Sequence, residues 1–150
     1  MPSSYTCLRY HVIFSTKNRL PLIGDAMRPR LHEYLGGIVR DNDGRLLAAG
    51  GAADHVHLLL SSHASRALSD LLREVKAGSS RWMHKTFPEL KEFAWQDGFG
   101  AFTVSQSSVE SVRRYIAEQA EHHRNITFQE EFIEFLKRHD VTYDERYIWG

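Results

Sequence analysis

The chain has 150 residues, 42% of them hydrophobic and 25% charged, which suits one globular domain over residues 1–150 with a buried core. Its one cysteine, Cys7, excludes an internal disulfide and a four-cysteine zinc site, and we expect Cys7 to be a small buried residue. No apolar run approaches membrane-spanning length, and no signal-peptide pattern follows Met1. We therefore expect a cytoplasmic protein without membrane contact.

The formal net charge is zero, which by itself argues mildly against a nucleic-acid partner, because phosphate binding usually requires a positively charged surface. The charges are unevenly distributed, however. Residues 1–85 hold 12 Lys and Arg against 7 Asp and Glu, whereas residues 86–150 hold 7 against 12. A neutral protein can therefore still present one basic face to a polyanion.

The first part of the chain predicts a strand, a helix and two further strands. Residues 8–15 alternate two sets of side chains and are rich in β-formers, which indicates a strand. Apolar residues over 27–38 repeat with helical spacing behind a candidate cap at Asp25. Two short strands are then expected at 45–50 and 55–61.

The rest of the chain predicts a helix capped by Ser65, a strand at 101–105 and a helix over 107–124. A short helix at 129–139 and an aromatic tail at 143–149 complete the chain. The order βαββαβ is typical of an α+β fold of ferredoxin-like type, an antiparallel sheet with helices on one face. The later helices and the tail would be additions to this unit.

The segment Asp54-His55-Val56-His57 begins the third predicted strand. Side chains two residues apart on a strand share a face and lie about 6.5 to 7 Å apart along the chain. His55 and His57 therefore point together, while Val56 points to the other side. Two such imidazoles can converge on one metal ion, although an isolated His-x-His is also compatible with two histidines on a half-buried strand.

The predicted helix over 107–124 carries Tyr115 and Gln119. Residues four apart stack on one helical face, so a phenol and a carboxamide oxygen would be presented to the same point. Taken alone, the pair is also compatible with a boundary tyrosine beside an exposed glutamine.

Together the two motifs resemble the single-tyrosine branch of the HUH nucleases, the transposases of bacterial insertion sequences. The similarity covers nearly the whole chain and includes residues 10–19, 72–81 and 95–99. The C-terminal part is similar to members associated with repeated extragenic palindromes.

The resemblance implies a metal-dependent enzyme that cleaves and rejoins single-stranded DNA at hairpin or palindromic ends. Tyr115 would be the catalytic nucleophile, giving a covalent 5′-phosphotyrosine and a free 3′-hydroxyl. His55, His57 and Gln119 would be the metal ligands. The resemblance favours Mg²⁺ or Mn²⁺, whereas ligand affinity alone would favour zinc.

The resemblance also implies a homodimer in which His55 and His57 of one subunit meet Tyr115 and Gln119 of the other. The sequence supports this indirectly, because a βαββαβ sheet leaves an apolar edge strand that a second copy could cover. Five cations are expected to contact DNA phosphates, with a solvated surface as the simpler alternative. They are Lys17, Arg19, Arg73, Lys76 and Arg81.

Three further histidines are left without an assigned role. His11 lies on a strand that could neighbour the His55 strand, whereas His122 and His123 follow the tyrosine helix. The last two could orient a metal ligand or balance the charge at a helix C-terminus.

Three other functions compete. A noncatalytic nucleic-acid-binding module of the same sheet type would carry aromatic residues on both central strands, where this chain has His55 and His57 on one of them. A small zinc hydrolase could use Asp54 as its base, although Asp54 is predicted to face away from His55. A domesticated nuclease that processes palindromes would keep the chemistry and change only the biological role.

Overall fold

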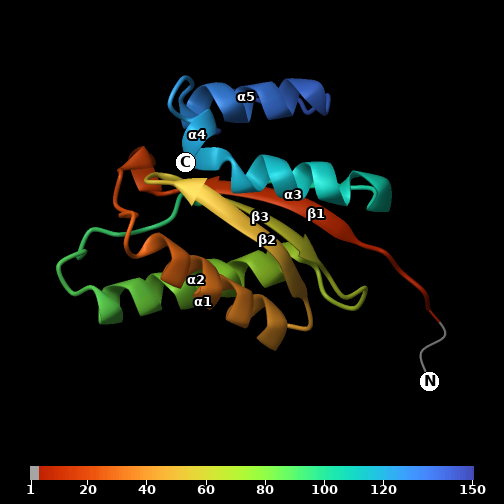
Figure 1. The fold of residues 1–150 in the computed structure, drawn as a ribbon, viewed down its shortest axis with the longest axis horizontal. Helices are drawn as coiled ribbons and strands as arrows, with labels where there is room; N and C mark the ends of the chain where they lie inside the picture. Colours follow the sequence, from red (N-terminus) through yellow and green to blue (C-terminus); the bar gives the residue numbers. More distant parts are fainter. Residues whose placement is uncertain (1–3) are drawn as a thin grey trace.

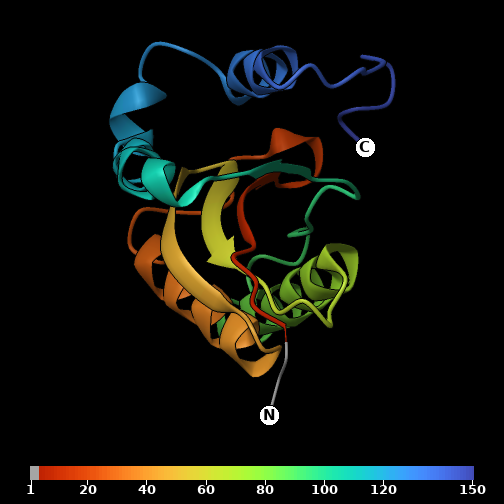
Figure 2. The same ribbon diagram turned by 90° about the vertical axis from the view of Figure 1, so that its right-hand side faces the viewer.

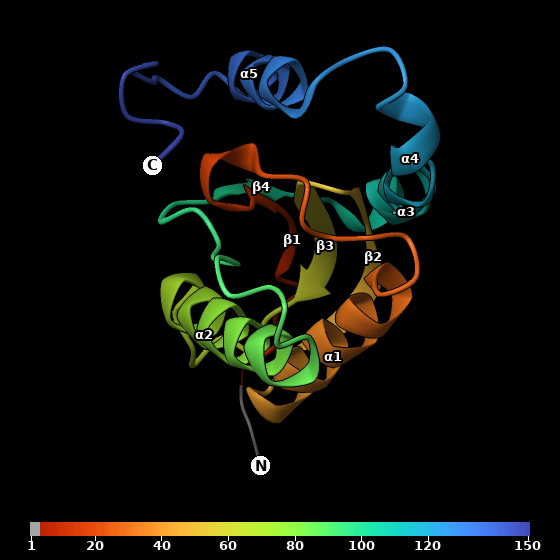
Figure 3. The same cartoon turned by 90° about the vertical axis from the view of Figure 1, so that its left-hand side faces the viewer.

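The computed structural model describes residues 4–150 and contains one four-stranded sheet in which every pair of neighbours is antiparallel. The strand order is β2-β3-β1-β4, the order of a βαββαβ ferredoxin-like unit, and it confirms the predicted fold class (Figure 3). The strands are β1 (Arg9–Ser15), β2 (Arg45–Ala52), β3 (His55–Ser61) and β4 (Gly100–Thr103).

Helices cover both faces of this sheet (Figures 1 and 2). The two long helices that belong to the βαββαβ unit lie together on one face, and three shorter helices lie on the other. The first pair is α1 (Arg28–Asp41) and α2 (Leu68–Thr86); the second group is α3 (Val109–Ala117), α4 (Gln119–His122) and α5 (Phe128–Arg138). Two 3₁₀ turns, η1 (Lys17–Arg19) and η2 (Gln106–Ser108), follow β1 and precede α3.

The alternation of side chains along β1 and β3 divides the interior into two parts. Val12, Phe14, Val56, Leu58 and Leu60 are fully buried against α1 and α2 in the larger apolar cluster. The residues between them in sequence face α3 and α5 instead. Burial of each large apolar side chain contributes about 1.5 to 3 kcal/mol, so the α1–α2 side supplies much of the stability.

The structure corrects two predicted helix caps. Helix α1 begins at Arg28 with Met27 as its N-cap, and Asp25 forms an ion pair with Arg28 instead of capping the backbone. Helix α2 begins at Leu68, three residues after Ser65, whose hydroxyl is hydrogen-bonded to the ring of His63. In both places a polar residue near the helix start makes a local side-chain contact in preference to a cap.

Two further expectations were wrong. The helix predicted over 107–124 is interrupted at Glu118, whose ψ of 15° separates α3 from α4. Cys7 is exposed, because it precedes β1 and packs into none of the three apolar clusters of the described residues. Within residues 4–150, no helix has both the length and the hydropathy that a membrane crossing requires.

Candidate metal and tyrosine site

The strand face beneath α3 and α5 carries buried histidines. His55 and His57 are fully buried on β3, and His11 on the paired strand β1 is 3% exposed. The prediction that His55 and His57 share one face is confirmed, as is the pairing of their strand with that of His11. Buried imidazoles lose their contacts with water, so each needs a polar partner inside the protein.

Gly50 on β2 lets the end of α3 approach the sheet closely. A Cβ atom at this position would lie only 2.1 Å from the carbonyl oxygen of Ile116. Only glycine fits here, and the chain then turns at Glu118 and inserts Gln119 into the interior, where it is 1% exposed. The break in the predicted helix therefore brings Gln119 to the histidines.

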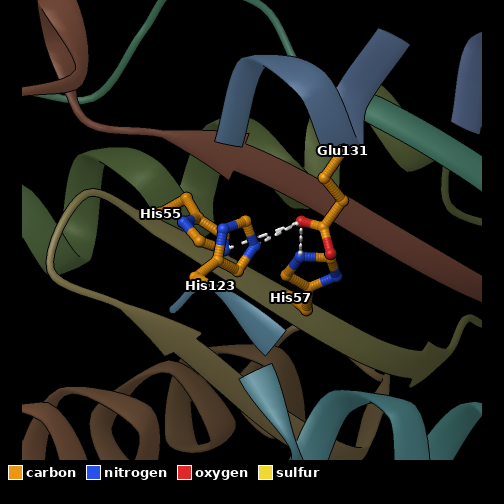
Figure 4. Close-up of side chains that lie close together, drawn as sticks. All are labelled: His55, His57, His123 and Glu131. Atoms are coloured by element: carbon orange, nitrogen blue, oxygen red, sulfur yellow. Dashed lines mark hydrogen bonds and ion pairs between the residues drawn. The ribbon is translucent and has the colours of Figure 1, made fainter. Parts of the chain in front are cut away.

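Helix α5 supplies a buried carboxylate from above the sheet (Figure 4). The helix starts with a capping box in which Thr127 accepts a hydrogen bond from the amide of Glu130 and Glu130 accepts one from the amide of Thr127. Glu131 follows within the first turn and is 2% exposed. Its side chain points down toward β3.

The carboxylate of Glu131 is the centre of the polar network. Its Oε1 lies 2.8 Å from Nε2 of His57, 2.9 Å from Nε2 of His123 and 3.7 Å from Nε2 of His55. Its Oε2 accepts hydrogen bonds from the phenol of Tyr115 and, at 3.1 Å, from the amide nitrogen of Gln119. One carboxylate thus links the histidines to the tyrosine.

The outer nitrogens of the three histidines also have partners. Nδ1 of His55 lies 2.8 Å from Oδ1 of Asp54, and Nδ1 of His57 lies 2.7 Å from Nε2 of His11. Nδ1 of His123 lies 2.9 Å from the carbonyl oxygen of Ile126. Such contacts hold the rings and direct the opposite nitrogen of each toward the centre, as is usual for histidines that bind metals.

The inner atoms of the cluster are mostly hydrogen-bond acceptors. The carbonyl of Ile126 can only accept, so Nδ1 of His123 carries a hydrogen. In a neutral ring Nε2 then presents a lone pair to Glu131, and only the protonated ring can donate to that carboxylate. By the same reasoning His55, bonded to Asp54, presents a lone pair to Oε1 of Gln119 at 3.0 Å. Acceptors facing one another require extra protons or a cation, and a divalent ion would satisfy all of them.

The geometry is also suitable for an ion. One ligand atom from each of His55, His57, His123 and Glu131 lies within 4.8 Å of all the others. Ligands at about 2.1 Å from an ion would be about 3.0 to 4.2 Å apart, so small side-chain movements close the site. The four residues can hold a metal ion, and Oε1 of Gln119 is placed to join them.

Burial and charge set the protonation of these groups. Burial lowers the pKa of His57 to about 4, so its ring is neutral at pH 7, the form that binds metals. For Glu131, burial acts to raise the pKa, but hydrogen bonds from His123 and His57 outweigh burial and hold the pKa well below its usual range. For His123, burial acts to lower the pKa, but the contact with Glu131 outweighs it and raises the pKa.

Tyr115 lies at the edge of this cluster, half-buried on α3. Besides Glu131, its hydroxyl lies 3.3 Å from Nε2 of His122. Burial and the neighbouring Glu131 carboxylate raise the pKa of Tyr115 well above its usual value, so its protonated form is the resting one.

The structure therefore brings Tyr115, Gln119, His55 and His57 together within one chain. Asp54 does not face away from His55 as expected, because it precedes β3 in a turn and is bonded to the ring of His55. Asp54 is therefore not free to act as the base of a zinc hydrolase.

Sequence reasoning missed Glu131 altogether and left His123 undecided. The signal for Glu131 was the Thr127-x-x-Glu130 capping box, which fixes where α5 begins and thus which residues occupy its first turn. No pattern in the sequence shows that this turn lies over β3, because that depends on packing across the sheet.

The five predicted DNA-contacting cations are not on one surface. Arg19 in η1 donates to the carbonyl of Trp149 at 2.7 Å, whereas Arg73 and Arg81 are exposed on α2, across the sheet from α5. The ammonium of Lys76 donates to backbone carbonyls of residues 96–98, and Lys17 is exposed in η1. The ammonium of Lys76 is therefore already hydrogen-bonded within the protein. Contact of all five cations with DNA stays a prediction.

Comparison with known proteins gives consistent matches. The family model described as "Transposase IS200 like" matches residues 4–119. The ISDra2 transposase TnpA of Deinococcus radiodurans is 30% identical over 117 residues, which cover 75% of this chain and 84% of that protein. The transposase of insertion sequence element IS200 from Salmonella typhimurium is 28% identical over 119 residues, covering 75% and 77%.

Two solved structures are also similar. A protein of Deinococcus radiodurans assigned as a transposase superposes with a TM-score of 0.65 and 28% identity, covering 77% of this chain and 94% of that one. The REP-associated tyrosine transposase bound to a REP hairpin has the same fold, with a TM-score of 0.55, 17% identity and coverage of 77% and 70%. His123 and Glu131 lie beyond the segment that the family model matches.

Proposed function

Because this chain belongs to the IS200-like transposase family, we propose that it cleaves and rejoins single-stranded DNA through a covalent bond between Tyr115 and a 5′-phosphate. One observation carries the proposal: Glu131 accepts a hydrogen bond from the phenol of Tyr115 and faces His57 and His123 with the same carboxylate. The nucleophile and the metal-binding cluster are therefore adjacent parts of one site.

We assign the ion to His55, His57, His123, Glu131 and the carboxamide oxygen of Gln119. When bound there, a divalent ion would neutralise negative charge on the nonbridging oxygens of the phosphate. Mg²⁺ and Mn²⁺ are both candidates for the cofactor. Three imidazoles favour Mn²⁺ over Mg²⁺ in affinity, and the carboxylate suits either ion.

The chemistry at phosphorus is a substitution. The phenolic oxygen of Tyr115 forms a bond to phosphorus as the bond from phosphorus to O3′ breaks, leaving a 5′-phosphotyrosine and a 3′-hydroxyl. The proton of the phenol is directed at Oε2 of Glu131, where its hydrogen bond already points. Attack of a 3′-hydroxyl on the phosphotyrosine reverses these changes and joins two strands.

The expected substrate is single-stranded DNA with hairpin or palindromic ends, in the bacterial cytoplasm. The hairpin in the complex of the REP-associated transposase, which has the same fold, supports this choice. A domesticated nuclease that processes palindromes without moving its own gene would use the same site.

A homodimer stays part of the proposal, but the catalytic groups do not require one. Within one chain Gln119 already contacts His55, and Tyr115 already contacts Glu131. Mixing Tyr115→Phe with His57→Ala tests whether two copies share sites. Activity in the mixture of the two inactive variants would show that one site takes residues from two subunits. A mixture that stays inactive would show that each site is built within one chain.

The test of the function is a denaturant-resistant protein–DNA adduct. Purified protein is mixed with Mn²⁺ or Mg²⁺ and single-stranded oligonucleotides that tile the flanks of its gene. The adduct is expected to disappear with chelator, with Tyr115→Phe and with His57→Ala. It should persist in two matched controls, Tyr5→Phe and His63→Ala, whose side chains are exposed away from the cluster.

An adduct that survives Tyr115→Phe would move the nucleophile to another residue. Tight hairpin binding without any adduct would instead favour the noncatalytic binding module.

A further inference from the structure

A cleft of about 550 Å³ opens beside Tyr115, between β4, α3 and α5. We call it the tyrosine cleft. Cavities of about 300 to 1,000 Å³ are typical of small-molecule sites, so there is room for one nucleotide. Its lining includes Tyr115 itself but none of His55, His123 and Glu131.

One wall of the tyrosine cleft is aromatic. The rings of Phe102 and Phe135 are stacked with centroids 5.4 Å apart, and the ring of His139 lies 4.4 Å from Phe102. Nδ1 of His139 donates to the carbonyl of Phe135 at 2.9 Å, which holds the imidazole in place. His139 is exposed, so its ring offers a surface on which a nucleobase can stack.

The other parts of the lining are suited to a sugar and a phosphate. Ser105, Ser108 and Ser111 line the cleft, and their hydroxyls are bonded to one another, to the hydroxyl of Ser107 or to nearby backbone. Arg138 lies on the α5 side, and its guanidinium pairs with Glu134 at 2.7 Å. The Arg138 side chain is 61% exposed, so it can turn to a phosphate.

The direction of attack decides which nucleotide occupies the cleft. In a substitution at phosphorus the attacking and leaving oxygens are in line, so O3′ departs on the side opposite the phenol. The nucleotide upstream of the break is therefore directed away from Tyr115. The downstream nucleotide stays covalently attached to Tyr115 through its 5′-phosphate and must lie beside it.

We propose that the tyrosine cleft binds the first nucleotide on the 3′ side of the break, with its base stacked on His139 and its next phosphate near Arg138. This inference rests on the proposed function and adds a subsite to it. It predicts that the strand held as phosphotyrosine is anchored by its first base during the interval before rejoining.

The experiment measures the rate of adduct formation on one cleavable oligonucleotide and on versions that lack a single base. Removal of the first base downstream of the break is expected to slow the wild-type protein by roughly 5- to 150-fold, the range for one base stacked on an aromatic side chain. His139→Ala should slow the reaction on intact DNA by a similar factor. It should cause little further loss when that base is already missing.

Ser111→Trp, which fills the cleft from an exposed position on α3, should slow the reaction on intact DNA. Arg138→Gln should slow it less. The matched control is Arg146→Gln, since Arg146 also pairs with a carboxylate, that of Asp144, but lies outside the cleft.

Adduct formation that is unaffected by Ser111→Trp and His139→Ala would overturn the subsite and leave the proposed function intact. If His139→Ala caused little further loss when the base upstream of the break is missing, and a full loss when the downstream base is missing, the cleft would hold the upstream nucleotide. This result would overturn the assignment of the cleft to the downstream nucleotide. Failure of every oligonucleotide to form an adduct would overturn the proposed function, and the subsite with it.

Discussion

The two faces of the sheet are built from the same strands but differ in chemistry, because the face beneath α3 and α5 combines apolar packing with a cluster of buried histidines. Facing α1 and α2, β3 presents Val56, Leu58 and Leu60, all fully buried among apolar neighbours. Facing α5, the same strand presents His55 and His57, also fully buried but held by Asp54, Gln119, His11 and Glu131.

This difference separates stability from function. An apolar side chain gains free energy wherever it is removed from water, whereas a buried imidazole or carboxylate gains only if each polar atom finds a partner. A chain selected for stability alone has no need of three histidines around one buried carboxylate. We therefore expect changes on the two faces to affect different measurements.

The largest effect is expected on the apolar face. Leu58→Ala should lower the free energy of unfolding by about 2 to 5 kcal/mol, because it leaves a cavity in a fully buried cluster. Denaturant unfolding measures this loss, and Mn²⁺ binding to the folded variant should be retained. A loss below about 1 kcal/mol would show that this face is less well packed than its burial indicates.

Metal binding should raise stability through the polar face. At a free Mn²⁺ concentration about 100 times the dissociation constant, the free energy of unfolding should rise by about 2.7 kcal/mol, and chelator should reverse the change. Glu131→Gln should weaken or abolish this increase. Glu134→Gln on an exposed position of the same helix is the control, and an equal response of both variants would exclude Glu131 as a ligand.

A histidine away from both the cluster and the cleft should control part of the acid sensitivity. Burial, with a smaller contribution from Arg28, lowers the pKa of His32 on α1 to about 4. Between about pH 6.5 and 4 the unfolded chain binds a proton that folded His32 does not, so stability falls as pH falls, by up to about 1.4 kcal/mol per pH unit.

His32→Leu should remove this part of the pH dependence. The free energy of unfolding of the variant should therefore fall less than that of the wild type between pH 8 and pH 4. Unfolding curves from pH 8 to 4 measure the slope for each protein. If the free energy of unfolding changed with pH by the same amount in the variant and the wild type, the lowered pKa of His32 would be contradicted.

The smallest effect is expected at the start of α5. Thr127→Ala removes half of the capping box and should cost about 1 kcal/mol, expressed mainly as faster hydrogen exchange of α5 amides. Amides of α1 and α2 should be unchanged. Exchange that increases equally in all helices would mean that α5 unfolds only together with the rest of the domain.

Much of the fold could be predicted because local patterns carry it. Alternation in β1 and β3 and the helical stripe of α2 appear directly in the sequence, since burial of one face imposes a period of two or 3.6. The caps at Asp25 and Ser65 were wrong because a polar residue near a helix start has several local partners of similar strength. The turn at Glu118 was missed because it follows from the close approach of Ile116 to Gly50, far away in the chain.

By itself, the sequence determined which side chains share a strand face, and therefore that His55 and His57 point to the same side of the sheet. It also carried the resemblance that predicted Tyr115 as the nucleophile and Gln119 as a metal ligand. Only the tertiary structure decided that Glu131 of α5 and His123 complete the cluster, and that Tyr115 reaches it within one chain. The reason is physical: spacing along one element is set by backbone geometry, whereas contacts between elements depend on how separate helices pack across the sheet.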